Sequence, residues 1–260
     1  MKDYFGENCT YLLEYFHRQF RMRRELFLRI LNDVKAYDDY FIQKRNATGR
    51  LGLFSIQKMT TAIRILTYGC AGDHCDKYIK IDKSTAIETR MTFCKAVIGV
   101  YREEYMRPPN EANIARLLQE REERGLPGML GFVDCMHWEW KNCPVAWRGT
   151  HEERFHMPTL ILEAIASKDL WIWHALFGMP ATLMQTIPHP ITVKEKLSTQ
   201  KQEACRKDVE RAFGVLQSKW TITQGPVHFW DKGDLCLIMK TYIILHNIII
   251  EDVRHVNVGR

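Results

Sequence analysis

Two acidic residues of this sequence could support metal-assisted chemistry, and Asp134 is the first of them. It belongs to residues 129–141, MLGFVDCMHWEWK, in which side chains alternate between two faces as in a β-strand. The face of Asp134 is otherwise apolar, with Leu130, Phe132, Met136, Trp138 and Trp140. A buried carboxylate is costly unless it pairs with a cation, accepts several hydrogen bonds or binds a metal. Asp134 is therefore expected to be a metal ligand or one half of a salt bridge.

The second acidic residue, Glu210, lies in a predicted helix over residues 201–220, KQEACRKDVERAFGVLQSKW. The apolar stripe of this helix consists of Val209, Ala212, Phe213, Leu216 and Trp220. Glu210 lies next to the stripe and can lean toward the sheet, whereas Asp208 is rotated by about 200° from Glu210. The alternative is an i,i+4 ion pair between Arg206 and Glu210, which contributes about a few tenths of a kcal/mol.

The elements around these acids predict a ribonuclease H-like α/β core. Two β-prone runs, 159–167 (TLILEAIAS) and 170–178 (LWIWHALFG), predict a hairpin with Asp169 in its turn. A strand with an acid, a hairpin and a helix with a second acid follow one another as in such cores, whose inward carboxylates hold two divalent ions. Magnesium prefers oxygen ligands and keeps several waters, so carboxylates suffice to hold it.

The first half of the chain has helical periodicity, so we expect a helical region over residues 1–125 and the nuclease-like domain over 126–260. The whole protein is then of the α+β class. Helical spacing and capping residues predict helices over residues 12–34, 55–68, 85–105 and 107–125, the last with Asn110 as its cap. The stretch GLPG, 125–128, is the predicted linker, because the periodicity changes from 3.6 to 2 at Met129.

Part of the helical region has the outline of a DNA-binding helix-turn-helix. A short helix near residues 71–79 and a turn precede a longer helix, which opens with the capping box Thr85 and Glu88. The first residues of the second helix would face the major groove: Lys83, Ser84, Thr85 and Thr89. A basic cluster is expected to contact DNA phosphates and includes Arg21, Arg23 and Arg24. The same sequence also fits an ordinary helical bundle.

Charge, cysteine content and hydropathy narrow the class of protein. Residues 1–128 carry 22 Lys+Arg against 17 Asp+Glu, a balance of +5 that is compatible with phosphate binding. The eight cysteines form no CxxC pair, so we expect reduced thiols in an intracellular protein. The apolar run 236–250 is interrupted by Lys240, His246 and Asn247, and we expect it to pack rather than to span a membrane. No small-molecule cofactor is predicted.

Four long segments carry a family resemblance: MLGFVDCMHWEWKNCPVAWRG, PTLILEAIASKDLWIWHALFGMP, KQEACRKDVERAFGVLQ and ILHNIIIED. They resemble plant PIF/Harbinger transposase-derived proteins, a family that includes domesticated nuclease-like and antagonist-of-silencing (ALP-type) members. The resemblance implies an Asp-Asp-Glu (DDE) nuclease that cuts DNA with magnesium or manganese. By motif, its first acid is Asp134 and its last is Glu210. It also implies residence in the nucleus, with DNA and possible chromatin-associated proteins as partners.

One stretch departs from the pattern of this family. After Gly178-Met179-Pro180 the family has an asparagine and the middle aspartate, but residues 170–193 contain no Asp or Glu. Residues 184–188, MQTIP, resemble a segment that lies well downstream in the family. This indicates an internal deletion with its join near Leu183 and Met184. The nuclease domain is thus expected to be incomplete around 180–190 and to lack the middle acid.

This departure leaves three functions open. Two metals about 3.5–4 Å apart need bridging and flanking carboxylates, which Asp134 and Glu210 alone do not supply. The first function is a transposase-derived, nuclease-like protein that has lost its chemistry and keeps DNA or partner binding through residues 1–125. The others are an active divalent-metal endonuclease with a substitute ligand, and a domesticated chromatin-interaction protein without nuclease activity.

Overall fold

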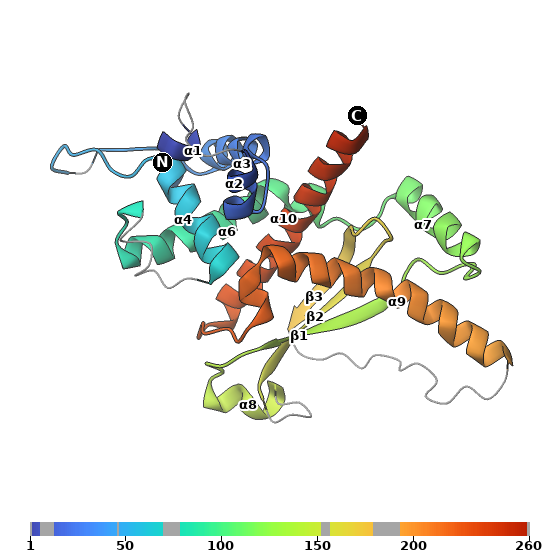
Figure 1. The fold of residues 1–260 in the computed structure, drawn as a ribbon. Coiled ribbons are helices and arrows are strands. Elements are labelled where there is room, and N and C mark those ends of the chain that lie inside the picture. Colours follow the sequence, from blue (N-terminus) through green and yellow to red (C-terminus); the bar gives the residue numbers. More distant parts are fainter. Residues whose placement is uncertain are drawn as a thin grey trace. The chain divides into compact units, whose positions relative to one another are not determined.

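The computed structural model describes residues 2–5, 13–45, 47–69, 79–151, 157–178 and 193–258. It contains both helices and strands, which confirms the predicted α+β class (Figure 1). The chain forms two compact units, called here unit 1 and unit 2. Unit 1 consists of Met1–Glu103, Lys219–Gln224 and Asp231–Arg260, and unit 2 of Glu104–Ser218 and Gly225–Trp230. The predicted short helix near 71–79 and the predicted join lie outside the described residues, apart from Ile79.

Unit 1 is helical in its described residues. Its elements are α1 (Lys2–Phe5), α2 (Leu13–Phe20), α3 (Arg24–Tyr37), η1 (Asp39–Phe41), α4 (Ser55–Tyr68), α6 (Lys83–Tyr105) up to Glu103, η2 (Thr221–Gln224) and α10 (Lys232–Val258). Part of its core is aromatic. The buried rings of Phe16, Phe20 and Phe27 have centroids 4.4 to 5.6 Å apart, which joins α2 to α3.

The helix predicted over 12–34 is in fact two helices, because the chain turns at Arg21. This residue has a φ of 60°, in the left-handed region, and its N–H donates to the carbonyl of His17 at 2.8 Å. The turn ends α2 as an αL cap does, and α3 begins at Arg24. The predicted basic cluster therefore lies at the junction of α2 and α3.

The next two predicted helices of unit 1 are confirmed, with one shifted end. α4 begins at Ser55 and is closed by Gly69, whose φ is 62°. α6 begins at Lys83, two residues before the predicted capping box, because Asp82 caps it: its carboxylate accepts the Ser84 backbone N–H at 3.0 Å. Hydrogen bonds from the Ser84 hydroxyl and backbone lower the pKa of Asp82.

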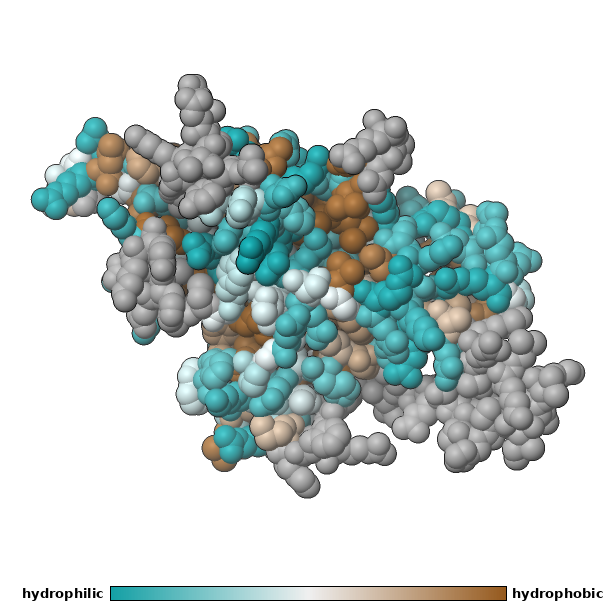
Figure 2. Space-filling view, viewed as in Figure 1, coloured by the Kyte–Doolittle hydropathy of each residue, from teal (hydrophilic) through white to brown (hydrophobic). Residues whose placement is uncertain are grey.

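The C-terminal helix α10 is buried throughout residues 241–250. His246 and Asn247 are fully buried within it, as the prediction of a packing helix requires. The stretch Lys232–Val256 contains an 18-residue window apolar enough to cross a membrane, but 72% of that window is buried inside the folded protein. This is weak evidence for a span, because a core helix passes the same test. On the face in Figure 2, hydrophilic residues predominate and hydrophobic ones form separate patches.

Raising the pH is expected to destabilise unit 1. Burial raises the pKa of the Cys94 thiol from 9.0 to about 11, and burial also raises the pKa of Tyr242 well above its usual value. The unfolded chain loses these protons at lower pH than the folded chain, so stability present below pH 9.0 is lost as the pH rises toward about 11. Thermal unfolding between these values measures the loss. Cys94→Ala should reduce the slope against pH, and an unchanged slope would contradict the assignment.

The described part of unit 2 is built around a three-stranded antiparallel sheet in the order β1-β2-β3. Its elements are α7 (Glu111–Glu123), β1 (Val133–Glu139), α8 (Val145–His151), β2 (Thr159–Ala166), β3 (Ile172–Gly178) and α9 (Val193–Lys219) up to Ser218. The register pairs Asp134 with Ala164, and Ala164 with Ala175. α9 crosses one face of this sheet (Figure 1), and the predicted stripe from Val209 to Leu216 is buried.

The predicted hairpin is confirmed between β2 and β3. Ser167 N–H donates to Trp171 O at 3.1 Å, and Leu170 N–H donates to Ser167 O at 2.9 Å. Leu170 has a φ of 69°, so the loop is a turn followed by a left-handed residue. Asp169 lies in this turn, as predicted.

The predicted linker GLPG directly follows helix α7, and its first two residues cap the C-terminal end of that helix. Asn110 caps the start of α7, accepting the Asn113 N–H at 2.9 Å as predicted. At the other end, Gly125 N–H donates to Glu122 O at 2.7 Å and Leu126 N–H to Arg121 O at 2.9 Å, a Schellman motif. α7 and this turn both lie in unit 2, so the compact units divide the chain elsewhere than at 125/126. The predicted domains stay a prediction.

Candidate functional site

Asp134 lies on the face of β1 that is covered, as the alternation predicts. Met136 and Trp138 on the same face are also buried, whereas Val133 and His137 on the opposite face are exposed. The Asp134 side chain is 9% exposed and bonds to Arg206 of α9. Arg206 Nε donates to Asp134 Oδ1 at 3.0 Å, and Nη2 lies 3.0 Å from the same oxygen. The salt-bridge alternative for Asp134 is therefore the one present in the structure.

Glu210 reaches the same arginine from the next turn of α9. Its Oε1 lies 3.7 Å from Arg206 Nε, so the predicted i,i+4 pair is present. The Glu210 side chain is 52% exposed, against 9% for Asp134. The structure thus brings the two predicted catalytic acids together, and it does so through one guanidinium.

The expectation that Glu210 rather than Asp208 faces inward was wrong. Asp208 is buried and Glu210 is exposed. Both residues lie about 100° from the centre of the apolar stripe, on opposite sides of it, so the helical geometry did not decide between them. Asp208 turns inward because Arg121 and Arg124 of α7 bind it at 3.1 and 2.5 Å.

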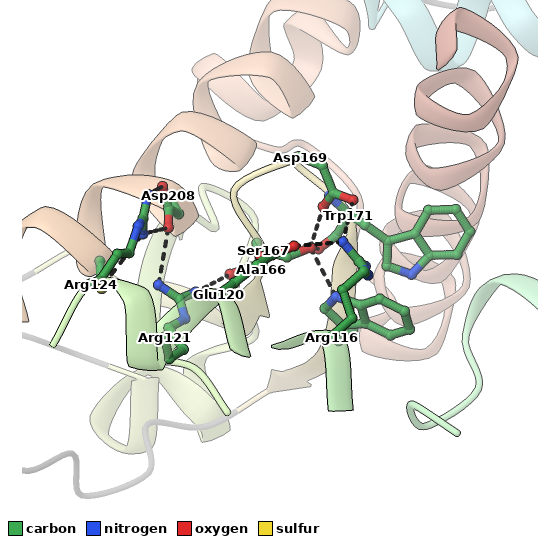
Figure 3. A network of polar contacts seen from close by, with 11 residues as sticks. Arg116, Glu120, Arg121, Arg124, Ala166, Ser167, Asp169, Trp171 and Asp208 are labelled. Carbon is green, nitrogen blue, oxygen red and sulfur yellow. Dashed lines mark hydrogen bonds and ion pairs between the residues drawn. The ribbon is translucent and has the colours of Figure 1, made fainter. Parts of the chain in front are cut away.

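Asp208 belongs to a polar network that ties three elements of unit 2 together (Figure 3). Arg121 is fully buried and donates both to Asp208 and, at 3.4 Å, to the carbonyl of Ala166 at the end of β2. Arg116, one turn earlier on α7, contacts Asp169 in the hairpin turn at 3.2 Å. Hydrogen bonding to Asp208 raises the pKa of Arg124. This network positions α7 against the hairpin and α9, and sequence periodicity gave no sign of it.

The residues around Asp134 do not fit a divalent-metal site. Magnesium takes oxygen ligands at about 2.0–2.1 Å, in octahedral geometry. Here two nitrogens of Arg206 already contact Asp134 Oδ1, and Glu210 lies against the same cation. Among the described residues, no three His, Cys, Asp or Glu side chains lie close enough together to hold an ion. The five described cysteines are free thiols.

The predicted DNA-contacting arginines differ in their surroundings. Arg23 donates two hydrogen bonds to the Asp252 carboxylate, at 2.6 and 2.5 Å, so its charge is matched within unit 1. These bonds raise the pKa of Arg23. Arg21 lies with its guanidinium carbon 5.6 Å from the ring centroid of Tyr68, and Arg24 is half-buried. Arg21 is the member of this cluster best placed for a ligand.

The residues at the start of α6 that were predicted to face the major groove also differ in their exposure. Lys83 and Ser84 are exposed and Thr85 is half-buried, so these three can face a ligand. Thr89 is fully buried and its hydroxyl lies 2.7 Å from Tyr40 Oη. A side chain enclosed in this way cannot reach a base, so the prediction that Thr89 contacts DNA is wrong.

A cluster of three basic side chains in unit 1 was not predicted. It consists of His17, Arg21 and Lys219, where the ends of α2 and α9 approach each other, and we call it the cation cluster. Burial, the Lys219 charge and the Arg21 charge lower the pKa of His17. Burial and the Arg21 charge lower the pKa of Lys219. Mutual repulsion of this kind favours binding of an anion. Lys219 is 198 residues from Arg21 in the sequence, so no local pattern could reveal the cluster.

The fold and these residues define a class: an α+β protein in which a basic helical unit accompanies an antiparallel sheet with an acid on its covered face. The model of the plant transposon protein family matches residues 103–183 and 180–257, which is more than half of the chain. The chain therefore belongs to this family, which confirms the predicted transposase-derived origin. Residues 1–35 match a domain of unknown function (DUF8418). No curated protein and no solved structure matches the chain.

Proposed function

We propose that the chain is a transposase-derived protein of the Harbinger type that binds DNA through its helical unit and has lost nuclease activity. The observation that carries this proposal is the shared contact of Asp134 and Glu210 with Arg206. A nuclease of the Asp-Asp-Glu kind needs its carboxylates for metal ions. Here both are taken by a side chain, and residues 170–193 supply no third acid.

The family match supports the proposed deletion. It comes in two segments that meet at residues 180–183, beside the predicted join at Leu183 and Met184. A chain that lacks an internal piece of the family's domain would match in this way. The ribonuclease H-like ancestry of the sheet belongs to the same proposal, and the antiparallel order β1-β2-β3 is compatible with it.

DNA binding is proposed for basic residues at two places in unit 1. The cation cluster lies where the ends of α2 and α9 approach each other, and Arg24 begins α3. Lys83 and Ser84 are exposed at the start of α6. Lysine and arginine contacts to phosphate supply affinity that does not depend on base sequence. We propose a nuclear location together with this role.

Incubation with supercoiled plasmid and manganese is expected to give retarded DNA without nicking. Retardation should weaken steeply with salt, because bound phosphates release counter-ions. Agarose gels read both effects at once, over a salt series and with a matched Asp134→Asn variant. That variant should give the same gel as the wild type.

Two results would contradict the proposal in different ways. Nicking that is lost in both Asp134→Asn and Glu210→Gln would show an active endonuclease with a substitute ligand. Absence of retardation at every salt concentration would remove the DNA-binding part. The function as a chromatin-interaction protein without DNA contact would then be the better account.

A further inference from the structure

The guanidinium of Arg206 lies where the two predicted metal ligands meet. We propose that Arg206 is the resident counter-ion of Asp134 and Glu210, takes the place of a divalent cation between them and excludes one. The assignment rests on the proposed function only in taking these acids as former metal ligands. Its readout is metal binding without DNA, so either proposal can fail while the other stands.

Local structure brings the three side chains together. β1 alternation places Asp134 on the covered face of the sheet, where α9 crosses it. Arg206 and Glu210 are four residues apart on α9 and therefore lie on one side of the helix. A cation on α9 can thus contact an acid on its own helix and an acid on the strand.

The burial of Asp134 explains why a counter-ion is needed there. Its side chain is 9% exposed, and an ionised carboxylate at that depth is costly without a partner. Nε and Nη2 of Arg206 both lie 3.0 Å from its Oδ1. A metal bound to this oxygen would have to displace the guanidinium. Since the arginine is part of the same chain, it is always present at the site, whereas the ion must come from solution.

Other carboxylates of unit 2 are neutralised in the same way. Asp208 pairs with Arg121 and Arg124, and Asp169 pairs with Arg116. Arginine forms planar, directional hydrogen bonds to carboxylates and stays charged at all relevant pH values. Unit 2 therefore uses arginines as fixed cations, and the Asp134 pair follows this pattern.

The test compares Mn²⁺ binding by the wild type and by Arg206→Gln. The loss of the electron paramagnetic resonance signal of free Mn²⁺ reports binding, and the melting temperature (Tm) reports stability. The wild type should leave the signal unchanged, with the same Tm in EDTA and in Mn²⁺. Arg206→Gln should have a lower Tm, remove free Mn²⁺ from solution and regain Tm as Mn²⁺ is added.

Matched controls locate the effect. Arg211→Gln removes the same charge from the exposed side of the same helix and should behave as the wild type. Adding Asp134→Asn to Arg206→Gln should abolish Mn²⁺ binding, because the buried ligand is then neutral. The double variant should also be more stable than Arg206→Gln alone in EDTA, since no buried charge is left without a partner.

Three outcomes would overturn the proposal. The first is Mn²⁺ binding by the wild type that depends on Asp134, and the second is an Arg206→Gln protein with wild-type Tm and no Mn²⁺ response. If Arg206→Gln does not fold, the double variant with Asp134→Asn should fold. Failure of that double variant is the third contradicting outcome, because it would place the role of Arg206 elsewhere than in neutralising Asp134.

Discussion

Replacing Asp208 by asparagine is expected to lower the free energy of unfolding by about 3–5 kcal/mol, because it leaves a buried cation without its counter-charge. Arg121 is 1% exposed at its side chain and Asp208 is 3% exposed. The amide keeps the size of the carboxylate but not its charge, so the guanidinium groups of Arg121 and Arg124 lose the anion that offsets their desolvation. Since typical domains unfold with about 5–15 kcal/mol, the loss would remove a large share of the stability of unit 2.

Urea unfolding followed by tryptophan fluorescence measures this loss. Glu210→Gln is the matched control, since it makes the same kind of change two residues further along α9 at a side chain that is 52% exposed. Its effect should stay within about 1 kcal/mol. Replacing the pair together, as Arg121→Met with Asp208→Leu, should recover much of the stability, because the fully buried charges are then gone and Arg124, 30% exposed, keeps access to water. A single Asp208→Asn change that costs less than its control would contradict this role for the network.

Local patterns predicted the parts of the fold that depend on neighbouring residues. The alternation of β1 placed Asp134 on the covered face, and the turn residues between β2 and β3 gave the hairpin. The apolar stripe gave the buried side of α9. These features follow from the periods of strand and helix, which a sequence shows directly.

Partners distant in sequence decided what local patterns left open. Asp208 and Glu210 have equivalent positions beside the stripe of α9, and the choice between them depends on Arg121, 87 residues away. Arg23 lies in a basic cluster of the kind that contacts DNA, yet its partner is Asp252, which is 229 residues away in the sequence. A charge pattern shows which residues can bind an anion, but it does not show which already have one.

The same limit applies to the helical unit. Thr89 follows the start of α6 by somewhat less than two turns, which fits a groove-facing position in an isolated helix-turn-helix. In the folded chain Thr89 is buried, and its hydroxyl forms a hydrogen bond with Tyr40 of η1. The cation cluster, by contrast, escaped sequence analysis because Lys219 reaches unit 1 from the far end of α9. The DNA-binding proposal is therefore best tested at Arg21 and Lys219.

Replacing both Arg21 and Lys219 by glutamine is expected to weaken binding of unspecific duplex DNA strongly. If each contacts a phosphate, each loss removes a charged hydrogen bond worth about 1.5–3 kcal/mol, or roughly tenfold to a hundredfold in affinity. The slope of log affinity against log salt should fall by about one per lost contact. Fluorescence anisotropy over a salt series measures both quantities. Lys95→Gln, an exposed charge on α6, is the control, and equal weakening by this control would contradict a specific role for the cation cluster.

Asp252→Asn should strengthen DNA binding. It tests whether the charge of Arg23 becomes available to DNA once its partner is removed. In the wild type Asp252 holds Arg23 by two hydrogen bonds, so this arginine adds little to the attraction of DNA. The amide frees its charge, and affinity at low salt should rise while the salt slope steepens. An unchanged affinity would mean that Arg23 faces away from the DNA. A rise in affinity would show that unit 1 keeps part of its basic surface neutralised by its own C-terminal helix.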